Sequence, residues 1–131
     1  TRNETDKTIL LVEDDPAILN LTKTVFQNLK YHVISASSPL VALELAGRLS
    51  TKIDLLITDV IMPRMNGYDL AEKLRPLFPD MKCLFMSGYT ADVLTDRATS
   101  NEELHFIQKP FSLAALTNRV RKILDSSREK E

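Results

Sequence analysis

Two apolar runs in the sequence end in acidic residues, and the position of these carboxylates is its most informative feature. The run TILLV is followed by Glu13, Asp14 and Asp15, and the run DLLIT is followed by Asp59. Carboxylates that crowd together repel each other, and burying them is costly unless a cation or a hydrogen-bond donor compensates. We therefore expect a functional site if the fold brings the ends of these two runs side by side.

Asp14 and Asp59 could together form a site for Mg²⁺ and a phosphoryl group. Mg²⁺ prefers oxygen ligands and bridges readily to phosphates, and a carboxylate can itself attack phosphorus to form an aspartyl phosphate. Lys109 and Ser87 follow later apolar runs and could neutralise the transferred group. Each has a plainer interpretation alone, because lysines are mostly solvated and Ser-Gly pairs mostly form turns. Their joint placement at the ends of runs favours the functional interpretation.

Five short apolar runs predict the strands of one sheet. They lie at 8–12, 32–36, 54–58, 82–86 and 105–108. The first, third and fourth are apolar at nearly every position, which is typical of strands covered on both faces. Segments of helical spacing alternate with them, so we predict an α/β fold with a doubly wound, five-stranded parallel sheet. The binding crevice of such a sheet lies beyond the carboxyl ends of its strands.

The helices are predicted from apolar side chains at helical spacing and from capping residues. In the first helix one face is predicted to carry Ile18, Leu21, Val25 and Leu29. Asp15 and Ser38, each before a proline, and Ser112 are expected to cap the helices that follow them. This role explains Asp15 better than a role as a metal ligand. Residues 90–103 have few apolar positions, which predicts one short helix weakly anchored to the sheet.

Composition and charge limit the function classes that this 131-residue chain can serve. Hydrophobic residues make up 44% of it, enough for the core of one domain, and 17 Lys and Arg against 18 Asp and Glu give a net charge of −1. This balance predicts no general attraction to nucleic acid or to an anionic membrane. No apolar stretch is long enough to span a bilayer. The lone Cys83 indicates a buried, reduced thiol in a cytoplasmic protein.

At the level of whole motifs, the sequence resembles the chemotaxis-regulator-like receiver domains of two-component response regulators. The motifs that carry the resemblance are, in order, LLVEDDP, TDVIMPRMNG, MSGY and FIQKPF. The resemblance covers residues 8–126 and leaves 1–7 and 127–131 as tails. It implies the flavodoxin-like (βα)5 fold of those domains.

The resemblance implies roles for the residues around the acidic motifs. Asp59 would be the phospho-acceptor, and Mg²⁺ would be held by the side chains of Asp14 and Asp59 and by the backbone carbonyl of Ile61. Glu13 would act through a bound water. Gly67 fits the need for a backbone turn before the third helix.

The resemblance also implies a conformational switch. Lys109 would pair with the phospho-acceptor and then with the phosphoryl group, and the Lys109–Pro110 bond looks like the family's cis peptide. Phosphorylation would draw Ser87 toward a phosphoryl oxygen, so that Phe106 turns inward and remodels the face formed by residues 90–108 and the last helix. A homodimer could form through the same face.

Two positions predict a long-lived phosphoryl group. In receivers, the residues two places after the phospho-acceptor and two places after the hydroxyl residue help to orient the attacking water. These positions are Ile61 and Tyr89 in this sequence, and both are poorly suited to hold a water for hydrolysis. We therefore expect slower loss of phosphate than in receivers with amide or acid side chains there.

Two other functions are consistent with part of the pattern. A phosphatase of the haloacid-dehalogenase type also forms an aspartyl phosphate. Such enzymes carry the motif D-x-D, with a second acid two residues after the nucleophile, whereas Asp59 is followed by Val60 and Ile61. A receiver-like interaction module that needs no phosphate is the other alternative. The presence of all four residue types, at Asp14, Asp59, Ser87 and Lys109, disfavours it.

The partner implied by the resemblance is a histidine kinase or a histidine phosphotransfer protein. The segments FMSGYTAD and FIQKPFS look most like those of receivers at the C-terminus of hybrid sensor histidine kinases. The absence of an initiator Met agrees with an excised domain. We expect no separate enzyme activity beyond self-catalysed phosphotransfer and slow dephosphorylation.

Overall fold

A computed structural model describes residues 7–88 and 104–129 of the chain. The elements follow one another as β1 (Thr8–Val12), α1 (Pro16–Asn28), β2 (His32–Ala36), α2 (Pro39–Gly47), β3 (Leu55–Asp59), α3 (Gly67–Leu74), β4 (Lys82–Ser87), β5 (Leu104–Gln108) and α5 (Leu113–Glu129). The short helix predicted for 90–103 lies outside the described residues.

The five strands form one parallel sheet in the order β2-β1-β3-β4-β5, which confirms the predicted fold. β3 begins and ends one residue later than predicted, so that Asp59 is its last residue and pairs with Met86 of β4. β1 and β3 are direct neighbours although they are far apart in sequence. Their carboxyl ends therefore meet at one edge of the sheet, which we call the carboxyl edge.

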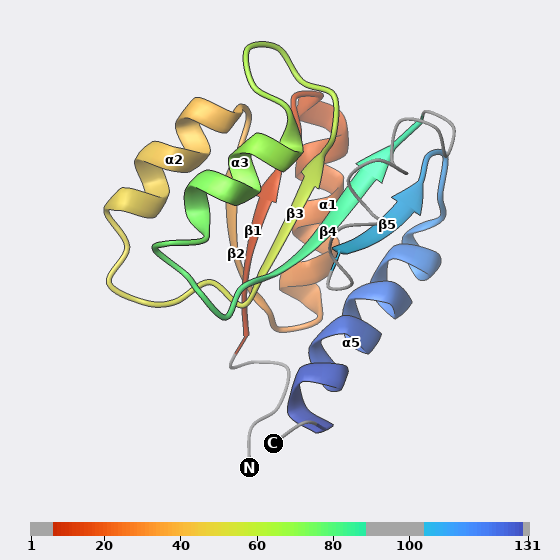
Figure 1. Ribbon diagram of the computed structural model, residues 1–131. Helices are drawn as coiled ribbons and strands as arrows, with labels where there is room; N and C mark the ends of the chain where they lie inside the picture. The colour runs from red at the N-terminus through yellow and green to blue at the C-terminus, as the bar shows by residue number, and fades with distance from the viewer. Residues whose placement is uncertain (1–6, 89–103, 130–131) are drawn as a thin grey trace.

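Helices cover both faces of the sheet (Figure 1). α2 and α3 pack on one face, where the buried core includes Leu10, Leu56, Leu74 and Phe85. α1 and α5 pack on the other face over a second buried group that includes Phe26, Leu84 and Val120. Alternate residues of β1, β3 and β4 point into the two groups, which explains why these runs are apolar at nearly every position.

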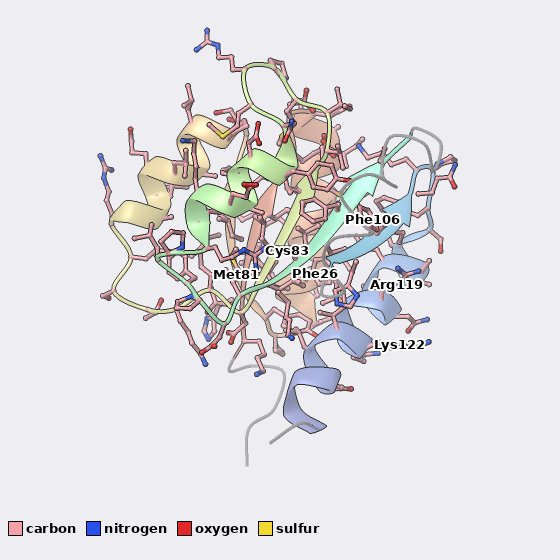
Figure 2. The ribbon with its side chains drawn as sticks, viewed as in Figure 1. Phe26, Met81, Cys83, Phe106, Arg119 and Lys122 are labelled. Atoms are coloured by element: carbon pink, nitrogen blue, oxygen red, sulfur yellow. The ribbon has the colours of Figure 1, made fainter. Side chains whose placement is uncertain are left out.

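The sequence has one cysteine, and it lies in the interior of the fold. Cys83 of β4 is buried and forms no disulfide, in agreement with the sequence-based expectation. Figure 2 shows Cys83 and Met81 near the start of β4. None of the helices in the described ranges is long and apolar enough to cross a membrane.

The predicted helix caps are present. The side chain of Asp15 accepts hydrogen bonds from the backbone N–H groups of Ala17 and Ile18, at 2.9 and 3.4 Å. Ser38 accepts from the N–H of Val41, and Ser112 accepts from the N–H of Ala115. These bonds satisfy N–H groups that have no partner within the helix, so each helix begins where the sequence places it.

The predicted apolar face of α1 is wrong in its orientation. Thr22 and Phe26 are the buried residues of this helix, whereas Ile18 is 38% and Leu21 is 55% exposed. Phe26 fills the space next to the sheet and makes an edge-to-face contact with Tyr31, which fixes the rotation of the helix. The first half of the expected stripe consequently faces solvent near the carboxyl edge.

The two ends of the folded domain lie at the edge of the sheet opposite the carboxyl edge. β1 starts there, and α5 runs back toward the same edge, so that its last turns lie near the start of β1 (Figure 1).

Candidate functional site

The carboxyl ends of β1 and β3 bring three acidic side chains together. Glu13 and Asp14 follow β1, and Asp59 ends the neighbouring strand β3. One carboxylate oxygen from each of the three lies within 4.8 Å of the others. Glu13 and Asp59 are buried, whereas Asp14 is exposed at the edge of the cluster. The fold thus brings together the acids that the two apolar runs hold apart in sequence.

Lys109 bridges two of these carboxylates. Its Nζ atom lies 2.7 Å from Oδ1 of Asp59 and 3.2 Å from Oε1 of Glu13. The lysine reaches them from beyond β5, and its backbone N–H donates to the carbonyl of Ser87 at 2.8 Å, which ties it to the end of β4. The Lys109–Pro110 peptide bond is cis. One ammonium therefore faces two buried carboxylates.

The protonation of Glu13 reflects this crowding. Burial raises the pKa of Glu13 above its ordinary value, and the adjacent Asp59 side chain raises it further. Two contacts oppose the rise, namely the N–H of Asp15, which donates to Oε2 of Glu13 at 3.0 Å, and the charge of Lys109. The net effect is a raised pKa, so keeping Glu13 charged at neutral pH costs free energy in the folded state.

The pKa of Lys109 is shifted by the same contacts. Burial by itself would lower the pKa of this lysine, but the ion pair with Asp59 and the charge of Glu13 outweigh burial and raise it. The side chain remains 30% exposed, so solvent screens part of the interaction. Lys109 is accordingly protonated at neutral pH.

A pocket of about 240 Å³ opens above the acidic cluster. It is lined by Asp14, Asp59, Ile61, Met86, Ser87, Gly88 and Lys109. Ser87, the last residue of β4, is buried in its wall, and Ile61 is 53% exposed at its mouth. The pocket thus gathers an acid pair, an ammonium and a hydroxyl group. Tyr89, the other residue predicted to affect phosphate lifetime, lies outside the described residues.

The loop between β3 and α3 is held tightly against Asp59. A Cβ atom on Gly67 would lie 2.2 Å from the backbone oxygen of Asp59, so this glycine is required by close approach. Gly67 has no positive φ, whereas Arg64 earlier in the loop does, so the close approach and not a left-handed conformation requires the glycine before α3. Asn66, which the sequence reading missed, caps α3 by accepting from the N–H of Asp69.

Phe106 lies outside the pocket, in an aromatic group on the α3 side of the sheet. Its ring centroid is 5.7 Å from that of Phe85 and 6.3 Å from that of Tyr68. On the other side, the guanidinium of Arg119 donates to the backbone carbonyl of Phe106. Figure 2 shows Arg119 on α5 beside Phe106 on β5. The strand that leads to Lys109 is therefore in contact with both α3 and α5.

The residues of the pocket fit a divalent cation with a preference for oxygen. Glu13, Asp14 and Asp59 offer only carboxylate oxygens, and neither histidine nor cysteine lines the pocket. Such hard, anionic donors suit Mg²⁺, and among the described residues that line the pocket Lys109 is the one cation, so the three carboxylates of the cluster outnumber it.

The chain belongs to the response regulator receiver domains, whose family model matches residues 9–121. It is thus a receiver domain of two-component systems, with the five-stranded parallel sheet typical of that class.

Two curated relatives come from Brucella abortus. The sensor kinase CckA is 36% identical over 118 residues, which are 90% of this chain and 12% of the kinase. The response regulator receiver protein CpdR is 33% identical over 119 residues, covering 90% of this chain and 97% of CpdR. The chain therefore spans a small part of the first relative and nearly the whole of the second.

Solved structures agree with this assignment. The receiver domain of the hybrid histidine kinase CckA superposes with a TM-score of 0.76 at 31% identity, over 89% of this chain and 98% of that one. A CheY-like receiver domain from Methanospirillum hungatei gives a TM-score of 0.83 at 28% identity, over 95% and 98% of the two chains.

Proposed function

We propose that this receiver accepts a phosphoryl group from a histidine protein onto Asp59, with Mg²⁺ as the cofactor. The observation that carries the proposal is the ion pair of 2.7 Å between Asp59 and Lys109, in a pocket that Asp14 also lines and beside the buried carboxylate of Glu13. A buried carboxylate at the base of a pocket is well placed as a nucleophile. The ammonium next to it can follow the charge as it moves to the phosphoryl oxygens.

In the proposed reaction, an oxygen of Asp59 attacks the phosphorus of a phosphohistidine. The new P–O bond forms as the P–N bond breaks, the electron pair of that bond goes to the imidazole nitrogen, and the imidazole takes up a proton from solvent. Lys109 would pass from the Asp59 carboxylate to a phosphoryl oxygen, and the hydroxyl of Ser87 would donate to another. The chain would thus catalyse its own phosphorylation without being a separate enzyme.

The metal would be held by the side chains of Asp14 and Asp59 and by the backbone carbonyl of Ile61, with Glu13 acting through a water. When bound, Mg²⁺ neutralises charge on the phosphoryl oxygens. The exposed position of Asp14 supports this assignment, because a cation that keeps several waters has to enter from the open side of the cluster.

The surface around the pocket supports a protein as the phosphodonor. Exposed apolar side chains lie on α1, at the start of α2 and at the pocket mouth; they are Ile18, Leu21, Leu40, Val41 and Ile61. Exposed apolar side chains that gather in one region of a surface, unlike scattered ones, are typical of contact surfaces. We infer that a histidine kinase or phosphotransfer protein covers them. Origin from a hybrid sensor kinase and a cytoplasmic location stay predictions.

A conformational response would follow phosphorylation. Movement of Ser87 would reach Lys109 through their backbone hydrogen bond. Lys109 follows β5, so the movement would also reach Phe106 on that strand. We infer that the β5 and α5 surface changes and that it is the surface offered to a target or to a second copy. Equal amide exchange of residues 104–108 with and without a phosphoryl mimic would contradict this switch.

The test of the proposed function is incubation with acetyl phosphate and Mg²⁺, followed by intact-mass spectrometry. The wild-type chain should gain one phosphoryl group, and Asp59→Asn should gain none. Asp54→Asn, which changes the aspartate at the other end of β3, is the matched control and should still be modified. Continuous release of phosphate without accumulation of the modified chain would favour a phosphatase, and no modification of the wild type would refute the proposal.

A further inference from the structure

A buried hydroxyl group lies directly beneath the proposed phospho-acceptor. Thr58 of β3 is completely buried, and its hydroxyl oxygen lies 3.0 Å from the backbone carbonyl oxygen of Asp59 and 3.8 Å from the sulfur of Met62. A hydroxyl has one proton to donate, and the shorter, well-formed bond is the one to the carbonyl. The thioether closes the other side of the hydroxyl as a soft contact.

This hydrogen bond is part of a clamp on the first turn of the loop after β3. The N–H of Val60 donates to the carbonyl of Met86 at 3.0 Å, and the N–H of Gly67 donates to the carbonyl of Val60 at 2.8 Å. Gly67 also packs closely against the Asp59 carbonyl, since a Cβ atom at this position would lie 2.2 Å from its oxygen. The peptide group that follows Asp59 is therefore held both by a hydrogen-bond donor and by close packing.

The surroundings of Thr58 do not by themselves call for a hydroxyl. Its partners on the two neighbouring strands are Val12 and Phe85, both apolar and buried. A valine has nearly the same shape and favours strands as strongly, but it would take the hydroxyl donor away from the Asp59 carbonyl. Core packing alone would accept valine, so the hydroxyl has its use in the bond to Asp59.

We propose that Thr58 is a positioning residue that fixes the backbone between Asp59 and Met62. The Asp59 carbonyl belongs to the first peptide of this loop, so the hydroxyl restricts the path of the backbone toward Ile61, which lines the pocket. The proposed metal and phosphoryl site needs the Ile61 carbonyl and the Asp59 carboxylate to point into the same space. The effect of Thr58 on metal and phosphoryl binding rests on the proposed function, whereas its hold on the loop does not.

Two substitutions separate the hydroxyl from the methyl group. Thr58→Val removes the hydroxyl and keeps the shape, whereas Thr58→Ser keeps the hydroxyl and removes the methyl. Thr22→Val is the matched control, because Thr22 is also a buried threonine but lies on α1. Three quantities are measured: Mg²⁺ affinity by titration calorimetry, the rate of modification by acetyl phosphate, and amide exchange of Gly67 in the metal-free chain by NMR.

We expect Thr58→Val to weaken Mg²⁺ binding about tenfold, the lower end of the range for groups that orient metal ligands. It should also slow modification and speed exchange of the Gly67 amide. Thr58→Ser should restore all three toward wild type, and Thr22→Val should leave them unchanged. Serine behaving like valine, or valine behaving like wild type, would overturn the proposal.

The exchange measurement keeps this proposal distinct from the proposed function. If the wild-type chain took up no phosphoryl group, the proposed function would fail, but the Gly67 amide would still report on the clamp. Unchanged exchange in Thr58→Val would show that the hydroxyl does not hold the loop, whatever the fate of the phosphoryl group.

Discussion

The two ends of β3 carry the same residue type in opposite situations. At the amino end, the carboxylate of Asp54 accepts from the backbone N–H of Thr8 at 2.8 Å, and its own N–H and carbonyl pair with β1 and with Lys82. At the carboxyl end, the carboxylate of Asp59 faces a second buried acid and an ammonium.

The difference lies in what compensates each charge. Asp54 is satisfied by a fixed backbone dipole, with Lys52 only 3.7 Å away in solvent, so its charge joins two strands and adds to stability. Asp59 shares one ammonium with Glu13, so part of the negative charge is uncompensated until a cation arrives. One aspartate holds two strands together, and the other lies in the site for which we propose a metal and a phosphoryl group.

Metal binding should give the largest difference in stability between the two ends of β3. At a free Mg²⁺ concentration a hundredfold above its Kd, the free energy of unfolding should rise by about 2.7 kcal/mol. Urea denaturation with and without Mg²⁺ measures it. Asp14→Asn should lose most of the gain, and Asp54→Asn should keep it. An equal gain in all three chains would contradict a metal site at the carboxyl edge.

Next in size is the loss of the carboxylate at the amino end. Asp54→Ala should lower the free energy of unfolding by about 2 kcal/mol, because the N–H of Thr8 loses a charged acceptor in a nearly buried position. Asp54→Asn retains an acceptor and should cost less. If the alanine variant were as stable as wild type, the backbone bond would not be the source of stability.

A smaller change of opposite sign is expected at the carboxyl end. The pKa of Glu13 is raised in the folded state, so its contribution to stability is most favourable below the ordinary value of 4.5 and is lost as pH rises through the folded pKa. Glu13→Gln should thus make the metal-free chain more stable at pH 7, and the difference should shrink toward pH 4. Urea denaturation at both pH values tests the sign; a less stable variant at pH 7 would contradict it.

The smallest effect belongs to the exposed lysine at the amino end. Lys52 is 59% exposed and 3.7 Å from Asp54, so Lys52→Met should change the free energy of unfolding by at most about 0.5 kcal/mol. Modification by acetyl phosphate should be unaffected. Lys109→Met is the matched change at the carboxyl end and should slow modification strongly. Equal rates of modification in the two variants would show that the lysine beside Asp59 has no special role.

The sequence predicts the order of strands and helices because the signals are local. Apolar runs, a capping side chain before proline and helical spacing each report on a few neighbouring residues. Residue type and position at a strand end likewise pointed to Asp14, Asp59, Ser87 and Lys109 as neighbours, because parallel strands align their ends.

Features that depend on tertiary contacts could not be predicted in this way. The rotation of α1 depends on where Phe26 meets the sheet, and the pattern of Ile18 and Leu21 is equally consistent with burial or with a contact surface. The need for Gly67 comes from a carbonyl eight residues earlier. In the sequence Thr58 is one more β-branched residue of a strand, and its hydrogen bond to the Asp59 carbonyl becomes visible only in the structure.

The position of the chain ends has a consequence for how this receiver can be used. β1 begins and α5 finishes at the edge remote from the acidic pocket (Figure 1). Polypeptide joined at either end would leave the opening unobstructed, so the same unit can operate alone or be tethered to a larger signalling protein. A tether of this kind would raise the local concentration of an attached phosphodonor without any change to the chemistry.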